Sequence, residues 1–290
     1  MNEIMQTVRD YYAKKKLGDI ISVEGLEPSA EAAEALALLP EDMRENKMLP
    51  GYSFPPMLDG FTVVVLGARC GRDAFVASKL VRESGKVIAI EGCARGVEKA
   101  NEAKEQVAQA FGFAKSNVHF VNATIEDLCA AGIADGSVDV VIANCAVSHS
   151  PFKLKVLSEV YRVLKEGGEF YEFDVFCKRR LDPEQKADPA IAGGLLAETG
   201  YGQDFRRTMR KSGLGGLPPH ELPCGRGDRR GGCEGERRRD YLRGTLCSRS
   251  EKPGHRGSLR TVRPVRHLRR QDCGLPGLLR PRQPSPLLHQ

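Results

Sequence analysis

The sequence predicts an α/β protein with a doubly wound, mostly parallel sheet. Two observations lead to this fold class. Short, apolar and largely β-branched runs, continuous over residues 61–66 and ending in an acid at residues 86–91, have the composition of strands that are buried on both faces. Amphipathic segments of helical length separate these runs, and strands that alternate with helices in this way pair in parallel. We therefore expect a layered sheet covered by helices.

The individual elements follow in chain order from the same two patterns. We expect strands at residues 61–66, 86–91, 117–123, 138–145 and 169–176, and helices at residues 73–84, 95–111, 125–133 and 152–165. Gly167 and Gly168 should end the last of these helices as a C-cap pair. One more helical stretch is expected within residues 187–212, with its clearest part near residues 204–213.

The chain divides into three parts. Residues 1–57 form an N-terminal helical or irregular segment, in which residues 29–39 place Ala and Leu at helical spacing behind Ser29, a residue that can cap the helix. Several prolines then interrupt the chain. Residues 58–212 form the α/β domain, and residues 213–290 form a tail of different composition.

The tail holds 13 Gly and 9 Pro in 78 residues, and Arg replaces Lys almost completely. Neither a period of 2 nor one of 3.6 is visible, so this segment cannot bury enough apolar surface to offset its chain entropy. We expect it to be disordered. The abrupt change in composition suggests an out-of-frame translation of GC-rich coding sequence; the alternative is an Arg/Gly-rich arm that binds RNA.

Charge and cysteine content narrow the classes of function. The formal net charge of +6 comes from the tail, which holds 16 Arg and 1 Lys against 7 acidic residues, so the rest of the chain gives no electrostatic reason to expect nucleic acid. No apolar stretch reaches about 18 residues, and the N-terminus lacks the apolar region of a secretory signal. The cysteines show neither a disulfide nor a zinc spacing, which favours a cytoplasmic protein with reduced thiols.

The turn after the first predicted strand is the first candidate site. It reads Gly-Ala-Arg-Cys-Gly, and Gly67, Ala68 and Gly71 let its backbone approach a ligand beyond the strand ends. The second strand ends at Glu91, where a carboxylate can accept hydrogen bonds from the two hydroxyls of a ribose. A Gly-rich turn followed by an acid suits NAD and S-adenosyl-L-methionine (SAM) alike.

The later strands favour SAM over a dinucleotide. Ile125 and Glu126 follow the third strand, where a polar residue can meet an adenine amino group, and Asn144 follows the fourth strand beside the expected sulfonium. Together with the run LKEGGEF before the fifth strand, these features resemble the class I SAM-dependent methyltransferases. The resemblance implies a Rossmann-like sheet, SAM as cofactor and methyl transfer as the reaction. A dinucleotide-dependent oxidoreductase is a distant alternative.

More selective motifs resemble the arsenite methyltransferases within that class. They are VRDYY at residues 8–12, LDG at 58–60, GRD at 71–73, FGF at 111–113 and IANC at 142–145. The likeness covers about residues 8–212 and ends where the tail begins, so the chain looks like a divergent, C-terminally truncated or frameshifted member. The family's substrate is trivalent arsenic held by cysteine thiolates, with a thiol reductant as partner.

The resemblance implies that Cys145 is a catalytic thiolate that holds arsenic near the methyl group. Arsenic(III) is soft and prefers sulfur, and its lone pair attacks the sulfonium methyl, so the reaction needs near-attack geometry and no general base. A resident metal ion is not expected. The implied cofactor contacts are Gly67, Ala68, Gly71, Asp73, Glu91, Ile125, Glu126 and Asn144.

Several positions depart from the family's pattern. Its N-terminal cysteines have no counterpart here, Val65 stands in place of an Asp, and Arg69 stands in place of a Gly at the closest approach of the loop. Three interpretations of Arg69 stay open: it points to solvent, it contacts the SAM carboxylate, or it crowds the site. The alternative functions are methyl transfer to another small acceptor, with Cys145 only packed, and a noncatalytic remnant of the fold. His149 and Asp174 lie within reach of a substrate, although a solvated loop position and a strand-end cap are simpler explanations of them.

Overall fold

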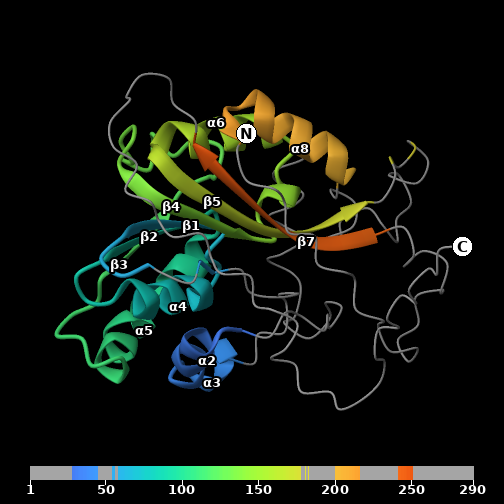
Figure 1. The fold of residues 1–290 in the computed structure, drawn as a ribbon. Helices are drawn as coiled ribbons and strands as arrows, with labels where there is room; N and C mark the ends of the chain where they lie inside the picture. Colours follow the sequence, from blue (N-terminus) through green and yellow to red (C-terminus); the bar gives the residue numbers. More distant parts are fainter. Residues whose placement is uncertain are drawn as a thin grey trace, which may run out of the picture. The chain divides into compact units, whose positions relative to one another are not determined.

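The computed structural model describes residues 28–44, 54–55, 58–177, 180, 182, 200–215 and 241–250. In this part of the chain, seven strands form one sheet in the order β3-β2-β1-β4-β5-β7-β6 (Figure 1). The first five, in chain order, are β1 (Thr62–Leu66), β2 (Lys86–Glu91), β3 (Val118–Asn122), β4 (Val138–Asn144) and β5 (Leu164–Cys177). Neighbours among these five pair in parallel, which confirms the predicted α/β class.

Helices cover both faces of this sheet. One face carries α2 (Ala30–Ala37), α3 (Glu41–Arg44), α4 (Arg72–Val81) and α5 (Ala94–Ala110), and the other carries η1 (Val147–His149), α6 (Lys153–Val163) and α8 (Gly202–Lys211) (Figure 1). Except for a helix within residues 125–133, the predicted helices are confirmed in the described residues. Residues 183–199, which held the start of the last predicted helical stretch, lie outside the described part, as do residues 8–12 with the VRDYY motif.

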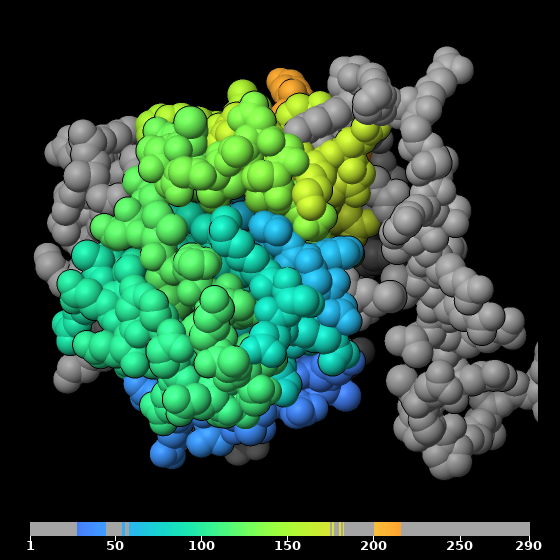
Figure 2. Space-filling view, turned by 90° about the vertical axis from the view of Figure 1, so that its left-hand side faces the viewer, coloured from blue at the N-terminus to red at the C-terminus, as the bar shows by residue number. Residues whose placement is uncertain are grey.

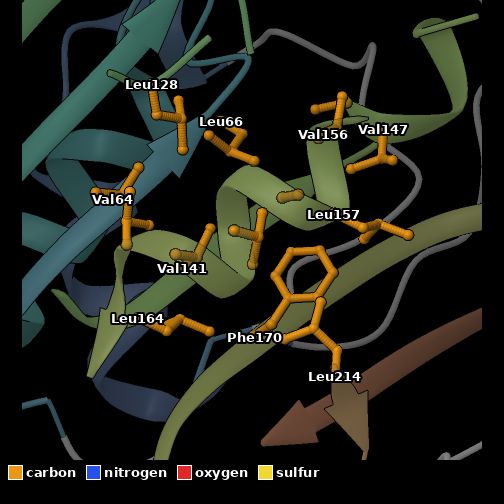
Figure 3. Close-up of a cluster of buried hydrophobic side chains, with 14 of the residues drawn as sticks. Val64, Leu66, Leu128, Val141, Val147, Val156, Leu157, Leu164, Phe170 and Leu214 are labelled. Atoms are coloured by element: carbon orange, nitrogen blue, oxygen red, sulfur yellow. The ribbon is translucent and has the colours of Figure 1, made fainter. Parts of the chain in front are cut away.

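The apolar core divides into two clusters because successive side chains of a strand point to opposite faces of the sheet. Val64 and Leu66 of β1 pack toward α6 with Val141 and Phe170 (Figure 3), whereas Val63 and Val65 pack on the other face, toward α4. Burying each such side chain contributes about 1.5–3 kcal/mol. On the face shown in Figure 2, residues from about 60 to 150 form one continuous packed surface.

The N-terminal helix begins where the sequence predicts. The side-chain oxygen of Ser29 accepts a hydrogen bond from the backbone N–H of Ala32 at 3.2 Å, which is the geometry of an N-cap. Ala32 and Ala35 of α2 are buried and pack with the α4 side of the core. Because α2 packs on α4, most of α4 is buried, and Ala74, Ala77 and Ser78 are among its buried residues.

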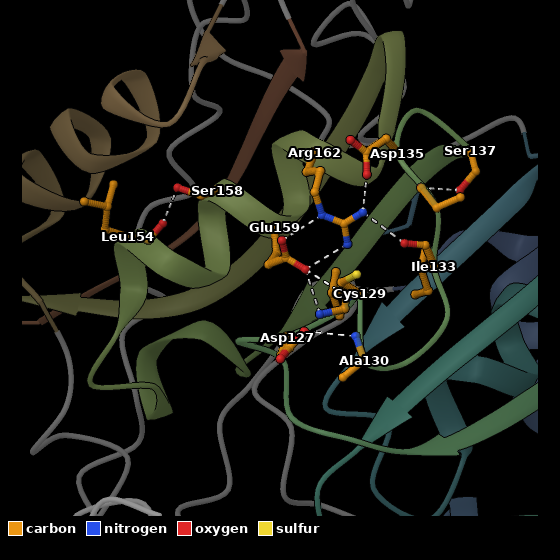
Figure 4. Close-up of polar contacts among 12 residues, drawn as sticks. Asp127, Cys129, Ala130, Ile133, Asp135, Ser137, Leu154, Ser158, Glu159 and Arg162 are labelled. Atoms are coloured by element: carbon orange, nitrogen blue, oxygen red, sulfur yellow. Dashed lines mark hydrogen bonds and ion pairs between the residues drawn. The ribbon is translucent and has the colours of Figure 1, made fainter.

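The predicted helix at residues 125–133 is wrong, because this segment consists of turns. Side chains of α6 satisfy its backbone groups instead of an i to i−4 ladder (Figure 4). One carboxylate oxygen of Glu159 accepts the N–H groups of Leu128 and Cys129 at 2.8 and 3.0 Å, and Arg162 donates to the carbonyl of Ile133 at 3.0 Å. Arg162 also bonds Glu159, which raises the Arg162 pKa and lowers the Glu159 pKa.

The glycine pair after α6 is not a helix cap, which corrects a second prediction. The helix ends at Val163, and Leu164 already begins β5 by pairing with Val138. The pairing register shifts before Val140, so Gly167, with φ of 71°, lies in an irregular, bulged part of the strand. Glycine adopts the positive φ of such a bulge without steric cost.

Two stretches of the predicted tail have secondary structure. Residues Tyr241–Ser250 form β7, which pairs antiparallel with β5, and residues Leu214–Gly215 form β6 beside it. The prediction of disorder is therefore wrong for these two stretches. Main-chain pairing along the edge of β5 satisfies rows of N–H and C=O groups and needs no side-chain periodicity. Residues 216–240 and 251–290 lie outside the described residues.

No helix in the described part of the chain is both long and apolar enough to span a membrane.

Candidate active site

The site lies where the strand order reverses. Strand β1 has β2 on one side and β4 on the other, so the chain leaves the ends of β1 and β4 in opposite directions. In a doubly wound sheet, this switch point opens a crevice beyond the carboxyl ends of the strands, and ligands bind there. The turns after β1, β2 and β4 meet at this edge.

The turn after β1 needs both of its glycines. Gly67 has φ of 67°, and a Cβ atom there would lie 2.9 Å from the Cβ of Ala146, in the segment after β4. Gly71 has φ of 98°, and a Cβ atom there would lie 2.8 Å from the ring of Phe75 and 3.0 Å from that of Phe120. Any side chain at either position would be strained and would push the turn outward.

Arg69 occupies the same turn in a conformation that suits glycine. Its φ is 52°, in the left-handed region that side chains disfavour. Its Nη1 atom is buried and has no hydrogen-bond partner among the described residues. The positive charge of the guanidinium lowers the pKa of both Cys145 and His149, so the group lies near the end of β4. Arg69 as a whole is half-buried, and the burial of this one nitrogen counts against the interpretation that the side chain points to solvent.

Glu91 joins the first two turns through its carboxylate. One oxygen accepts the backbone N–H of Arg69 at 2.6 Å, and the other accepts the N–H of Cys93 at 2.8 Å. The backbone carbonyl of Glu91 accepts the side-chain amide of Asn122 at 2.9 Å, which fixes the neighbouring strand end. The acid at the tip of β2 thus sets the shape of the turn that follows β1.

A polar pair links α4 with β4. The side-chain amide of Asn144 donates to the carboxylate of Asp73 at 3.0 Å, and both residues are buried. Asp73 also accepts from Nε of Arg72 at 3.3 Å. The other side-chain atom of Asn144, its carbonyl oxygen, is buried without a hydrogen-bond partner among the described residues. An acceptor of this kind at a strand end is available to a ligand.

Cys145 follows directly and is also in a strained conformation. Its φ is 53°, and its N–H donates to the carbonyl of Phe173 on β5 at 2.7 Å. Burial raises the pKa of the Cys145 thiol well above its ordinary value, and the Asp174 carboxylate raises it further. The positive charge of Arg69 lowers this pKa but does not offset the two other effects. The thiol is therefore protonated near neutral pH. Non-glycine residues at positive φ are concentrated at functional sites, and Arg69 and Cys145 lie at two adjoining strand ends.

The segment after Cys145 is held by acids from other elements. The backbone N–H of Ser148 donates to Asp174 at 3.1 Å, and the hydroxyl of Ser150 donates to Glu126 at 2.7 Å. Lys153 donates to the carbonyls of Ser148 and Ser150 at 3.0 and 2.8 Å. Glu126 is therefore engaged with the segment after β4, and not aimed freely outward.

His149 on η1 stays neutral. Burial lowers the pKa of His149 to about 3, and the charges of Arg69 and Lys153 act in the same direction. A neutral imidazole can donate or accept a hydrogen bond but carries no charge at physiological pH.

Glu172 is a buried acid, adjacent to the candidate site, that reasoning from the sequence missed. It is fully buried on β5, and burial, followed by the neighbouring Asp174 carboxylate, raises the pKa of Glu172 well above its usual value. The signal was present, because strand alternation places Glu172 and Asp174 on the face that carries Phe170 and Phe176. Ser148 and Lys153 were missed as well, since nothing in their local sequence indicates a site.

The other predicted residues lie as follows. Ala68 is buried, and its N–H donates to the carbonyl of Ile90 at 3.0 Å, whereas Ile125 packs at the edge of the core. Val65 is a core residue with 1% exposure. Cys70 is half-buried and Cys93 is exposed, so of the cysteines whose side chains the structure describes, only Cys145 is buried.

Comparison with known proteins agrees with this fold. A family model described as a methyltransferase domain matches residues 59–213. The arsenite methyltransferase of Aquipseudomonas alcaligenes is 42% identical over 164 residues, which cover 57% of this chain and 47% of that protein. The human arsenite methyltransferase is 33% identical over 224 residues, which cover 75% and 59%. The chain thus spans about half the length of the curated relatives that it matches.

A solved structure is similar as well. The crystal structure of an arsenic(III) S-adenosylmethionine methyltransferase from Chlamydomonas reinhardtii superimposes with a TM-score of 0.67 and 35% identity, over 79% of this chain and 76% of that one. Several enzyme classes share a Rossmann-like sheet with its site at the switch point, and these matches identify the class here as the SAM-dependent methyltransferases. This chain belongs to the methyltransferase-domain family, whose cofactor is SAM.

Proposed function

We propose that this chain transfers a methyl group from SAM to trivalent arsenic that is bound by a cysteine thiol. The observation that supports this most is the position of Cys145, a buried thiol at the carboxyl end of β4, beside Asn144 and the turn after β1. The relatives named as arsenite methyltransferases support the same substrate.

The residues at the switch point suit the cofactor. Glu91 would meet the ribose hydroxyls, the turn from Gly67 to Gly71 would meet the methionine part, and the unpartnered Asn144 oxygen would accept from the bound molecule. Asp73 would hold Asn144 in place. Ala68, Ile125 and Glu126 would line the adenosine side. When bound, SAM supplies an electrophilic methyl group on a sulfonium.

Cys145 would hold the acceptor. Its raised pKa means that the thiol arrives protonated, so binding of arsenic must displace a proton. Burial at the strand end then fixes the arsenic lone pair toward the sulfonium side, and such positioning supplies most of the catalysis in a displacement of this kind. Each transfer leaves the arsenic oxidised by two electrons, so a thiol reductant is required as a partner. A cytoplasmic location, where thiols stay reduced, fits this need.

Methyl transfer to As(III) by the full chain tests this function. With SAM labelled in its methyl group and a dithiol reductant present, we expect labelled methylarsenic from the wild type and none from Cys145→Ser. Cys129→Ser is the matched control, because Cys129 is exposed and lies outside the site. Equal formation of methylarsenic by Cys145→Ser would show that Cys145 does not hold the arsenic, and no methylarsenic from the wild type would remove arsenic from consideration.

Two observations favour alternative functions. The structure brings a single buried thiol to the site among the cysteines whose side chains it describes, which favours transfer to another small acceptor. The half-buried Arg69, with one guanidinium nitrogen buried near the end of β4, favours a noncatalytic remnant. If Arg69→Gly confers SAM binding that the wild type lacks, the remnant is the better description.

A further inference from the structure

The end of β4 lies beside a positive charge that no carboxylate of the described residues pairs with. Arg69 is half-buried, and its Nη1 atom is shielded from solvent without a hydrogen-bond partner among the described residues. The side chain forms no ion pair in the described part of the chain. A guanidinium nitrogen that is shielded from water normally has a partner. Methyl transfer at Cys145 gives this charge no role.

Backbone contacts place Arg69 beside the end of β4. Strands β1 and β4 pair in register and end side by side. In the turn after β1, a Cβ atom on Gly67 would lie 2.9 Å from the Cβ of Ala146, so the turn lies against the segment that follows β4. The backbone N–H of Arg69 donates to Glu91 at 2.6 Å, which fixes the turn in this position. The charge of Arg69 accordingly lowers the pKa of the Cys145 thiol.

The sulfonium of SAM is expected at the same strand end. The proposed function puts the methionine part of SAM along the turn after β1 and its methyl group beside Asn144 and Cys145. SAM carries a positive charge on its sulfur, whereas S-adenosylhomocysteine has a neutral thioether there. The adenosine and amino acid parts of the two molecules are the same. The guanidinium of Arg69 therefore repels the sulfur centre of SAM and not that of S-adenosylhomocysteine.

Two carboxylates near the thiol act against Arg69. Asp73 and Asp174 both raise the pKa of Cys145, so they favour a cation at this place, and the effect of Asp174 is larger than that of Arg69. Both acids also accept hydrogen bonds within the protein, Asp73 from Asn144 at 3.0 Å and Asp174 from the backbone N–H of Ser148 at 3.1 Å. Because the acids are present whatever residue stands at position 69, the effect of Arg69 is seen as a change in the preference between the two ligands.

We propose that Arg69 is a specificity-determining residue, which weakens the binding of SAM relative to that of S-adenosylhomocysteine by placing a like charge near the sulfonium. This rests on the proposed function, which puts the cofactor at the switch point. Two like unit charges about 10 Å apart at a partly buried site change a binding constant by about tenfold. Since methyl transfer converts the charged ligand into the neutral one, Arg69 shifts the balance of binding toward the product of the reaction.

The ratio of two dissociation constants tests this role. Calorimetric titration of the full chain with SAM and with S-adenosylhomocysteine gives the ratio for each variant, and contacts common to both ligands cancel in it. Arg69→Met keeps the length of the side chain and removes its charge, so we expect the affinity for SAM to rise about tenfold relative to that for S-adenosylhomocysteine. Arg69→Lys keeps the charge and should stay within about threefold of the wild-type ratio. Sinefungin, which carries an ammonium group in place of the sulfonium, should follow SAM.

Arg82→Met is the control, because Arg82 also has a positive φ but is exposed at the end of α4. Binding of the neutral ligand shows for each variant that the site is folded. The same ratio in the wild type and Arg69→Met would overturn this role of Arg69 and leave the proposed cofactor site standing. Binding of both ligands by Arg69→Met and of neither by the wild type would also overturn it, because Arg69 would then exclude the two alike. If neither protein binds any of the three ligands, the proposed function fails, and the role of Arg69 with it.

Discussion

The carboxylate of Glu91 accepts the backbone N–H of Arg69 at 2.6 Å, although the two residues lie 22 positions apart. The same carboxylate accepts the N–H of Cys93 through its other oxygen. One acid at the end of β2 therefore holds the turn after β1 in its left-handed conformation and closes the start of α5 against it. The shape of the proposed cofactor pocket depends on this contact.

Replacing Glu91 should loosen the turn even when no ligand is bound. Glu91→Ala removes two charge-assisted hydrogen bonds and leaves two backbone N–H groups without acceptors, so we expect a loss of about 1–3 kcal/mol in the free energy of unfolding. Denaturant titration of the full chain measures this. Glu102→Ala is the matched control, because Glu102 is exposed on α5. A Glu91→Ala variant as stable as the control would show that the contact contributes little.

Replacing Arg69 should have the opposite effect. Arg69→Gly relieves a left-handed φ that costs about 1–2 kcal/mol, against about 0.5–1 kcal/mol of added chain entropy, so stability should rise by up to about 1 kcal/mol. Arg82→Gly is the control, because Arg82 also has a positive φ, of 61°, but is exposed at the end of α4. Both variants should gain stability, and only Arg69→Gly should bind S-adenosylhomocysteine more tightly. A gain in affinity with both would mean that the effect is not local.

His149 should make the fold sensitive to acid. Its folded pKa of about 3 lies below the ordinary value of 6.5, so the stability it contributes is present above about pH 6.5 and is lost as the pH falls toward 3. The slope for one proton is at most about 1.4 kcal/mol per pH unit. Glu159, whose pKa is also lowered, adds to this loss. The contribution of His149 is measured as the unfolding free energy of the wild type minus that of His149→Gln. We expect this difference to become smaller as the pH falls below about 6. A difference that does not vary with pH would mean that the imidazole can take up a proton in the folded state.

The stability that Glu172 contributes should fall as the pH rises, which is the opposite of the trend for His149. Its folded pKa is raised, so its contribution is present below the ordinary value of 4.5 and is lost as the pH rises. Glu172→Gln removes the ionisation in the unfolded chain, and we expect this variant to gain stability over the wild type, by more at about pH 8 than at about pH 5. Glu166→Gln supplies the control on the same strand. The opposite trend would indicate that Glu172 is ionised in the folded protein.

The sequence predicted most of the sheet because its strands are made of local signals. Runs such as residues 61–66 are apolar and β-branched over their whole length, and Ser29 caps its helix with a contact three residues away. The failures involve contacts between distant residues. The turns at residues 125–133 exist because Glu159 and Arg162, about 30 positions later, bond to them. Strand β7 depends on the open edge of β5.

The candidate site shows the same division. The glycines, Glu91, Asn144 and Cys145 could be proposed from their places at strand ends. The position of Arg69 near the end of β4 and the burial of Glu172 beside Asp174 could not, because each depends on what the sheet brings beside it. Glu172 had a partial signal, because strand alternation assigns it to the same face as Phe170 and Phe176.

Calorimetric titration of the full chain with S-adenosylhomocysteine tests the central claim most directly, because every proposed role assumes that the switch point holds the cofactor. We expect binding in the micromolar range, about −8 kcal/mol, and a loss of about tenfold or more in Glu91→Ala. The absence of a binding signal from the wild type with either S-adenosylhomocysteine or SAM would contradict the claim that the switch point holds the cofactor.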